Sequence, residues 1–483
     1  MLFNSIAFAI FLPIVFILYW FATSKKIKLQ NILLFVSSYF FYACWDWRFV
    51  FLLLFSTLVD YITGIQIYNA KNQKTKKIGL YLSIAINLGF LGFFKYYNFF
   101  VESFVDFISL FGLQINSFAL RIMLPVGISF YTFHGLSYVF DIYKNKIKVE
   151  RNFIDYAVFV SFFPLLVSGP IERATHLLPQ LKKERSFDYS KAVDGMRQIL
   201  WGLFKKIVIA DNCGVYADMF FGNSNDFSGS SLVLGVLFFA IQIYGDFSGY
   251  SDIAIGTAKL FGIDLLRNFA YPYFSRDIAE YWRRWHISLS TWFRDYLYIP
   301  LGGSRGNTWM KIRNIFIIFV VSGFWHGANW TFIIWGALNA MFYLPLLLAQ
   351  RNRNHIETVA KGKLLPSMKD ICMMLTTFAL TAFAWIFFRA ESLEYANNYI
   401  SILFSSSLFT IPEFPEMGKA MVVALLTIGF FGVEWLGREQ QYAIANLGTQ
   451  WKRSYRWIAY SVLVFLIGMY MQTTGTPFIY FQF

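Results

Sequence analysis

Long apolar runs alternate with short polar segments along the whole chain. The runs cover about 6–21, 31–43, 48–68, 79–97, 122–142, 192–220, 231–262, 371–388, 419–436 and 457–473. A bilayer core is about 30 Å thick, and one crossing needs about 20 residues of helix. The pattern therefore predicts an all-α polytopic membrane protein with about 11–12 membrane-embedded helices. The first run lacks a charged segment before it and a small-residue cleavage site after it, so we expect a retained span.

Three segments depart from simple spans. The segment 162–170, FFPLLVSGP, contains two prolines and a glycine, which favours a re-entrant segment that is buried in protein or lines a cavity. The run at 315–348 is broken at Gly323 and Gly327, and the sequence does not determine how often it crosses the bilayer. Between them, residues 271–313 form a polar and aromatic block that carries seven basic residues.

Charge is sparse and clustered. Hydrophobic residues make up 57% of the chain and charged residues 14%, and the net charge is +14. The basic residues lie in short loops between apolar runs, which indicates the positive-inside pattern of a membrane protein rather than binding of nucleic acid. This pattern predicts that both termini lie outside. It also requires an even number of crossings between Lys311 and Arg351.

The organisation is that of one domain over 1–483. No internal repeat, low-complexity tract or long linker divides the chain. Three scattered cysteines at 44, 213 and 372 have no metal-type spacing, so we expect free thiols and no metal site.

His326 is the first candidate for chemistry. It lies in SGFWHGANW at 322–330, inside an apolar stretch where an ionisable side chain is costly. An imidazole has a pKa near neutrality, so it can serve as a general base for a reacting group. Gly323 and Gly327 would let a ligand approach the backbone closely. The alternative is a buried histidine whose ring is satisfied by a carbonyl or carboxylate. Trp325 and Asn329 are further candidates, as residues that line a chamber around His326.

His286 is the second candidate. It lies in WRRWHISLSTWFRDY at 282–296, which continues into LYIPLGGSR at 297–305. Arginines and tryptophans together could hold a phosphate-bearing ligand by bidentate contacts and stacking. An interfacial aromatic belt with snorkelling arginines is the alternative. The candidates for the chamber or donor site here are Arg283, Arg284, Trp285, Asp295 and Tyr296.

Two more polar segments interrupt apolar runs. YGDFSGYSD at 244–252 places carboxylates at membrane depth, so we expect them to pair with cations, such as arginines of the 276–294 block, or to line a wet cavity. Its candidate residues are Tyr244, Asp246, Ser248 and Asp252. PVGISFYTFH at 125–134 predicts a helix that begins at a proline. His134, His176 and His355 are weak candidates, for which a structural or solvated role is favoured.

These segments together resemble the membrane-bound O-acyltransferase (MBOAT) family. Specific elements run from about 122 to 348, and the similarity is greatest to the bacterial branch with the alginate O-acetyltransferase membrane subunit and the D-alanyl transfer protein of teichoic acid modification. The resemblance implies a ring of helices around a funnel or tunnel, with His326 near its bottleneck and His286 in the chamber. It also implies a cytoplasmic acyl thioester as co-substrate, acetyl-CoA or an acyl carrier protein, and no bound cofactor.

The function expected from this resemblance is O-acylation, most simply O-acetylation, of a cell-surface polysaccharide such as alginate or another exopolysaccharide. Transfer is direct or passes through a periplasmic acetyltransferase partner. D-alanyl transfer from a carrier protein to teichoic acid is one alternative. A polysaccharide transporter or flippase and a non-catalytic scaffold subunit are alternatives of another class.

Overall fold

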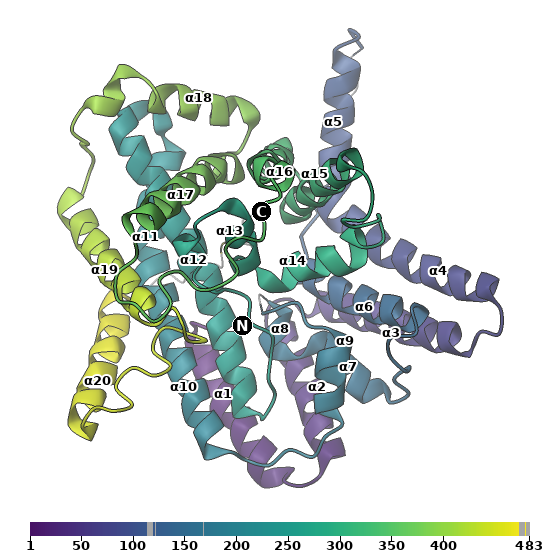
Figure 1. Ribbon diagram of the computed structural model, residues 1–483. Helices are drawn as coiled ribbons and strands as arrows, with labels where there is room; N and C mark the ends of the chain where they lie inside the picture. The colour runs from purple at the N-terminus through teal and green to yellow at the C-terminus, as the bar shows by residue number, and fades with distance from the viewer. Residues whose placement is uncertain (114–118, 121, 168, 473–478, 480–483) are drawn as a thin grey trace. The chain divides into compact units, whose positions relative to one another are not determined.

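A computed structural model describes residues 1–113, 119–120, 122–167, 169–472 and 479 (Figure 1). Every regular element in these ranges is a helix. This confirms the all-α class predicted from the apolar runs. The chain divides into two compact units, one of residues 1–192 with 258–266, the other of residues 193–257 with 267–483. The single domain expected from the sequence stays a prediction.

The first unit holds the N-terminal helices. Its elements are α1 (Ile6–Ile17), η1 (Leu18–Ala22), α2 (Ile27–Ala43), α3 (Arg48–Asn69), α4 (Gln73–Leu91), η2 (Gly92–Tyr96), α5 (Tyr97–Ser109), α6 (Ile128–Tyr143), α7 (Phe153–Ser161), α8 (Phe163–Leu166) and α9 (Ala174–Leu181). The segment 162–170 contains the four-residue helix α8 flanked by non-helical backbone, as its prolines predict. Whether it re-enters a membrane stays a prediction.

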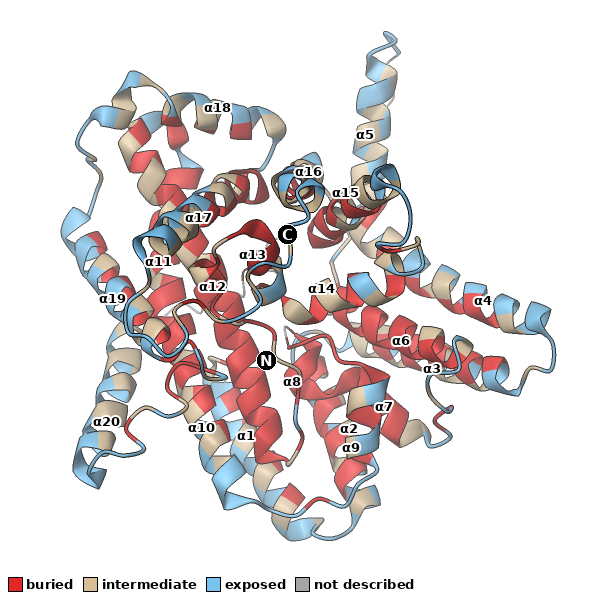
Figure 2. Cartoon of the chain, viewed as in Figure 1, coloured by how far each residue is buried: buried red, intermediate tan, exposed pale blue. Residues whose placement is uncertain are grey.

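The second unit begins within α10 (Tyr189–Leu203) and contains most of α12 (Gly229–Leu260). Its other elements are η3 (Phe204–Ala210), α11 (Asp211–Gly222), η4 (Ser224–Asp226), η5 (Pro272–Phe274), α13 (Ile278–Arg284), α14 (Ile287–Phe293), η6 (Arg294–Tyr298), α15 (Thr308–His326), α16 (Trp330–Leu348), α17 (Met368–Arg389), α18 (Leu393–Leu403), η7 (Ser406–Phe409), α19 (Met417–Leu436) and α20 (Arg453–Tyr470). Helix α12 is buried along nearly its whole length, whereas α20 has no buried residue (Figure 2).

Six helical segments among the described residues are long and apolar enough to cross a membrane: Arg48–Asn69, Gln73–Ser109, Gly229–Leu260, Trp330–Leu348, Met368–Arg389 and Met417–Leu436. A shorter apolar helix covers Ile6–Ala22. These segments match predicted runs closely, and the chain is a multi-pass membrane protein. The total of about 11–12 embedded helices and the central funnel stay predictions.

The broken run at 315–348 folds as the hairpin of α15 and α16. A Cβ on Gly323 would lie 2.2 Å from the carbonyl oxygen of Phe332, and one on Gly336 would lie 2.3 Å from that of Phe319. An earlier residue of α15 thus faces a later residue of α16, so the two helices are antiparallel and their backbones touch. Of these two helices α16 is a candidate span and α15 is not, so the number of crossings between Lys311 and Arg351 stays a prediction.

Helix α6 starts later than its proline predicts. Gly127 has a left-handed φ of 73°, and the helix begins at Ile128 rather than near Pro125. A Cβ on Gly127 would meet the carbonyl oxygen of Leu166 at 2.1 Å. The turn therefore needs glycine both for its φ and for the close approach of α8.

Candidate active site

His326 is the last residue of α15, at the closed end of the hairpin. Its side chain is 3% exposed, because aromatic rings surround it. The ring centroid lies 4.9 Å from that of Trp325, 5.3 Å from that of Trp335 and 5.5 Å from that of Phe388. The helix end and the close α15–α16 packing thus place an imidazole in an apolar cage.

His286 lies between α13 and α14 and is 1% exposed. Its φ of 42° is in the left-handed region, where a residue with a Cβ needs support from its surroundings. Asn268 provides that support, because its Oδ1 accepts a hydrogen bond from His286 Nδ1 at 2.9 Å and its main-chain oxygen accepts one from the Ile287 N–H at 2.8 Å. An amide oxygen accepts only, so Nδ1 carries the proton and Nε2 carries a lone pair.

The two histidines meet in the second unit. Their ring centroids are 6.4 Å apart, and Trp325 lies 6.1 Å from His286. His286 Nε2 is buried and has no hydrogen-bond partner among the described residues. Burial lowers the pKa of His286, which lies outside the candidate spanning helices, to about 3. His286 is therefore neutral at physiological pH, with an acceptor nitrogen available to a bound hydroxyl.

The arginines beside His286 have protein partners. Arg284 pairs with Glu280 at 2.8 Å, as Arg276 does at 3.0 Å. Arg283 donates to the main-chain oxygens of Asn352 at 2.8 Å and His355 at 2.7 Å. The guanidinium groups of Arg283 and Arg284 thus both stabilise the fold of this block. A further contact of either group with an acyl donor stays a prediction.

The remaining candidates of this block differ in position. Trp285 is buried at 1% exposure, and its ring stacks on that of Tyr281 with centroids 5.5 Å apart. Asp295 forms an ion pair with its neighbour Arg294 at 2.8 Å on a partly exposed turn. Tyr296 is 8% exposed and packs its ring 5.0 Å from that of Trp292.

Asn329 caps a helix. Its Oδ1 accepts from the Thr331 N–H at 3.0 Å at the start of α16, and its Nδ2 donates to the main-chain oxygen of Glu391 at 2.8 Å. The Oδ1 thus caps α16, and the Nδ2 ties the loop after His326 to the segment between α17 and α18.

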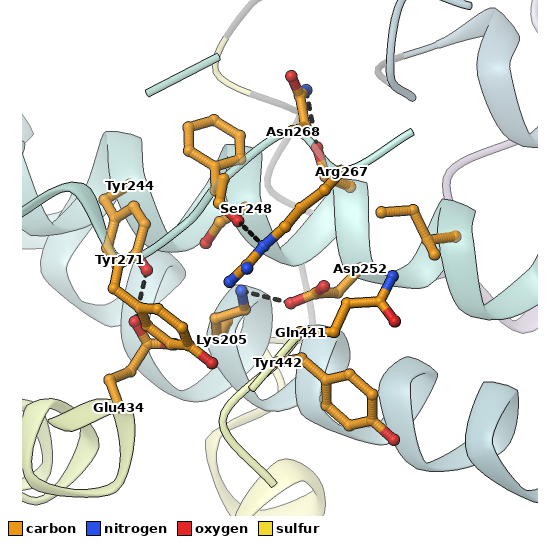
Figure 3. A pocket seen from close by; sticks show the side chains of 13 residues that line it. Lys205, Tyr244, Ser248, Asp252, Arg267, Asn268, Tyr271, Glu434, Gln441 and Tyr442 are labelled. Carbon is orange, nitrogen blue, oxygen red and sulfur yellow. Dashed lines mark hydrogen bonds and ion pairs between the residues drawn. The ribbon is translucent and has the colours of Figure 1, made fainter. Parts of the chain in front are cut away.

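The 244–252 segment lies on α12 and belongs to a buried network of charges (Figure 3). Asp252 pairs with Lys205 Nζ at 2.5 Å and accepts from Gln198 Nε2 at 2.8 Å. Asp246 pairs with Lys206 at 2.8 Å. The expectation that these carboxylates pair with cations is confirmed, but the cations are lysines of η3 rather than arginines of the 276–294 block.

A third carboxylate joins the network from α19. Glu434 is 2% exposed and accepts a short hydrogen bond from the hydroxyl of Tyr244. Both residues line a small cavity of about 20 Å³ together with Lys205, Ser248 and Asp252. A space of that size holds about one water molecule. A cavity is thus present beside these carboxylates, and its being wet stays a prediction.

The cavity connects to His286 through Asn268. Asn268 lines the cavity, donates from Nδ2 to Ser251 Oγ at 3.1 Å, and holds His286 with its Oδ1 (Figure 3 shows Asn268 and Ser248 at its wall). Ser248 Oγ is buried without a hydrogen-bond partner in the described part of the chain. The ring of Phe247 packs edge-on against the ring of His286, with the two centroids 4.6 Å apart.

The other histidines have structural partners. In the first unit, His134 accepts from the Glu172 N–H at 3.0 Å with Nε2, while Nδ1 lies 3.4 Å from the Val160 oxygen. His176 lies 2.8 Å from Glu172, whose hydrogen bond raises the pKa of the imidazole. In the second unit, His355 lies 3.9 Å from Asp277. The structural roles favoured for these residues agree with their contacts.

Sequence reasoning missed three residues of the site. Glu434 is a lone carboxylate within the apolar run 419–436, and Lys205 lies within the run 192–220, so the cost of a charge at membrane depth was the signal for both. Asn268 lies in no distinctive segment, and only its position beside His286 identifies it.

Comparison with known proteins places this chain among acyltransferases. The family model for MBOAT, the membrane-bound O-acyltransferase family, matches residues 144–379. A protein of Pseudomonas aeruginosa named probable alginate O-acetylase AlgI is 39% identical over 445 residues, which cover 90% of this chain and 82% of that protein. The peptidoglycan O-acetyltransferase of Helicobacter pylori is 37% identical over 427 residues, 82% of this chain and 78% of that enzyme.

A more distant relative is the teichoic acid D-alanyltransferase of Bacillus subtilis, 28% identical over 280 residues, which cover 55% of this chain and 69% of that enzyme. The similarity to the two acetylases is higher and extends over most of both chains, through the hairpin of His326 and the block of His286. With multiple helices able to span a membrane, the chain belongs to the MBOAT family and is a membrane-bound O-acyltransferase.

Proposed function

We propose that this protein transfers an acetyl group from a cytoplasmic thioester, acetyl-CoA or an acyl carrier protein, to a hydroxyl destined for a cell-surface polysaccharide, with His326 as the base. The observation that carries the proposal is the pair of buried imidazoles, His326 and His286, with ring centroids 6.4 Å apart in a cage of aromatic rings. Exclusion of water from such a cage protects a thioester from hydrolysis.

In the proposed reaction, His326 takes the proton of the acceptor hydroxyl as its oxygen attacks the thioester carbonyl carbon. A C–O bond forms, the C–S bond breaks, and the leaving thiolate takes the proton from the imidazolium. Atoms and charge balance, and the enzyme returns to its starting state. The reaction needs no metal or redox step, since base catalysis supplies the proton transfer.

His286 takes a different part. Its low pKa makes it a weak base, so it does not compete for the proton. Its Nε2 lone pair accepts a hydrogen bond from a neighbouring second hydroxyl of the acceptor, which orients the sugar and leaves the proton of the reacting hydroxyl to His326. Asn268 is a positioning residue, since its Oδ1 fixes the tautomer that leaves Nε2 as the acceptor.

Acetyl is preferred as the acyl group because the O-acetylating relatives match this chain more closely and over more of its length than the D-alanyltransferase does. Transfer from the bacterial inner membrane to the polymer is direct or passes through a periplasmic partner that relays the acetyl group. D-alanyl transfer from a carrier protein to teichoic acid is the second candidate.

The test is thioester consumption by the purified full chain in nanodiscs, with radiolabelled acetyl-CoA or acetylated carrier protein as donor and an alginate oligomer as acceptor. Wild type is expected to release free thiol and label the oligomer, and His326→Ala is expected to lose both. A parallel reaction with D-alanyl carrier protein and lipoteichoic acid tests the second candidate.

His355→Ala is the matched control, because it removes a histidine of the same unit outside the pair. Loss of transfer in His326→Ala but not in His355→Ala, at equal melting temperature, supports the proposal. Full transfer by His326→Ala contradicts the role of His326. Transfer of D-alanine but not acetyl overturns the choice of acyl group.

A further inference from the structure

A second cavity lies within the first unit, in segments of the chain other than those that carry His286 and His326. Its volume is about 440 Å³, which is in the range of small-molecule sites rather than single ions. Basic residues from two stretches of chain line it: Lys183, Arg185, Lys191 and Lys259. The proposed acyl transfer assigns no role to this cavity.

Arg185 is the buried and fixed cation of this wall. It is 7% exposed, and its Nη2 donates to Asn31 Oδ1, while its Nε and Nη1 are buried without a hydrogen-bond partner. Its guanidinium carbon lies 5.6 Å over the ring of Tyr19. No carboxylate forms an ion pair with Arg185 among the described residues. Asp155 reaches this guanidinium only through Asn31, whose Nδ2 donates to Asp155 Oδ1 at 2.8 Å. A buried, fixed guanidinium with two unpartnered nitrogens favours an anionic ligand.

The cavity is preformed. Gln180 on α9 and Asp264 exchange two hydrogen bonds, Nε2 to the Asp264 oxygen at 2.9 Å and the Asp264 N–H to Oε1 at 2.8 Å. Trp20 Nε1 donates to the Leu260 oxygen at 2.9 Å. These bonds tie the 258–266 segment to α9 and η1, so binding requires little ordering of the walls.

Three carboxylates also line the cavity, and two are engaged. Asp264 pairs with Lys191 at 3.0 Å. Asp188 accepts from the Ser190 N–H at 2.8 Å and from Ser190 Oγ at 2.7 Å. Glu184 is exposed at the rim and opposes an anion. Lys183 and Arg185 remain in excess over it.

We propose that this cavity binds a phosphate ester, with Arg185 as the fixed anchor and Lys183 at the rim. Guanidinium and ammonium groups are the usual partners of phosphate oxygens. Two sources carry this chemistry, the nucleotide part of a coenzyme A thioester and the headgroup of an anionic phospholipid. The site stands independently of the proposed acyl transfer, since its residues are separate from the histidine pair.

The experiment measures binding of two probes to the purified full chain. One arm titrates coenzyme A by calorimetry in neutral detergent, and the other measures partition of phosphatidylglycerol against phosphatidylcholine by native mass spectrometry. Arg185→Gln is expected to weaken the bound phosphate ester about tenfold or more and Lys183→Gln a few-fold, whereas Glu184→Gln should strengthen it. Lys71→Gln, an exposed lysine of the α3–α4 loop, is the charge-matched control.

Loss of coenzyme A binding in Arg185→Gln identifies the nucleotide as the source, and loss of phosphatidylglycerol preference identifies the lipid. Lys183→Gln and Glu184→Gln keep the test decisive if Arg185→Gln fails to fold, because both positions are exposed. Binding of both probes that is unchanged in all the cavity variants overturns the proposal. His326→Ala should bind like wild type, so failure of this site and failure of the acyl-transfer proposal are distinguishable.

Discussion

His134 in the first unit and His286 in the second are both completely buried, yet their rings are satisfied differently. Main-chain groups lie beside both nitrogens of His134, the Glu172 N–H at 3.0 Å and the Val160 oxygen at 3.4 Å. His286 has one partner, Asn268, and its Nε2 has none among the described residues. Burial alone therefore does not distinguish a structural histidine from a functional one.

The difference lies in what the surroundings leave available. The ring of His134 forms hydrogen bonds with main-chain groups that have no partner in a helix, so its role is structural. Around His286, a backbone with a left-handed φ of 42° and the buried amide of Asn268 hold the ring, and Nε2 has no hydrogen-bond partner among the described residues. His326 extends the contrast, since aromatic rings form its cage and the ring of His286 lies 6.4 Å away.

The largest expected effect is that of His326→Ala. Removing a general base lowers the rate of acyl transfer by about 10²–10⁴-fold, because the acceptor hydroxyl then loses its proton to water or to a weaker base. Single-turnover transfer at matched folding measures the change. A loss of less than tenfold would mean that the base lies elsewhere.

His286→Gln should cost less. Its Nε2 hydrogen bond to the acceptor is worth about 10–100-fold in rate. Glutamine can still donate to Asn268, which keeps the block folded. The readout is kcat/KM against acceptor concentration, with the melting temperature as control. A rate equal to that of wild type would place His286 with His134, among the structural histidines.

His134→Ala should show the opposite profile. It orphans the buried N–H of Glu172, which lowers the free energy of unfolding by about 1–3 kcal/mol, and it leaves the rate per folded molecule unchanged. Urea or thermal unfolding in detergent measures the first quantity. A slowed reaction at unchanged stability would contradict the distinction drawn between the two residues.

Asn268→Ala tests how the tautomer of His286 is held. Without Oδ1 the ring loses its fixed orientation, and kcat should fall about tenfold while KM for the acceptor changes little. The ¹⁵N chemical shifts of His286 provide a direct check, since the Nδ1–H form should become mixed. Unchanged shifts in the variant would mean that Asn268 does not select the tautomer.

The smallest effect concerns pH. Since folding lowers the pKa of His286 from its ordinary value near 6.5 to about 3, the unfolded state binds the proton more readily, and stability is lost as pH falls below about 6.5. Between pH 7.5 and 5.5 this amounts to about 1 kcal/mol. His286→Gln should lose less stability than wild type over that interval. An equal loss in both proteins would mean that His286 is already solvated.

Much of the site was predictable from the free-energy cost of burying polar groups in apolar stretches. The two histidines, and the carboxylates Asp246 and Asp252, are polar groups within apolar or aromatic stretches, and each proved to be buried with partners or beside a cavity. Asn268 was not predictable in the same way, because an asparagine before an aromatic segment is ordinary in a loop. The lysine partners of the carboxylates likewise lie some forty residues away along the chain.

By itself the sequence determined the helical elements, the membrane class and the family. Hydrophobic runs fix helix positions because the bilayer forces the backbone to satisfy its own hydrogen bonds, and the runs at 48–68, 231–262 and 419–436 became α3, α12 and α19 within a few residues. Tertiary structure decided the partners. It set Lys205 against Asp252, folded 308–348 into a hairpin through glycine contacts, and placed His286 beside His326. Such contacts depend on side-chain packing between distant segments, which local composition does not specify.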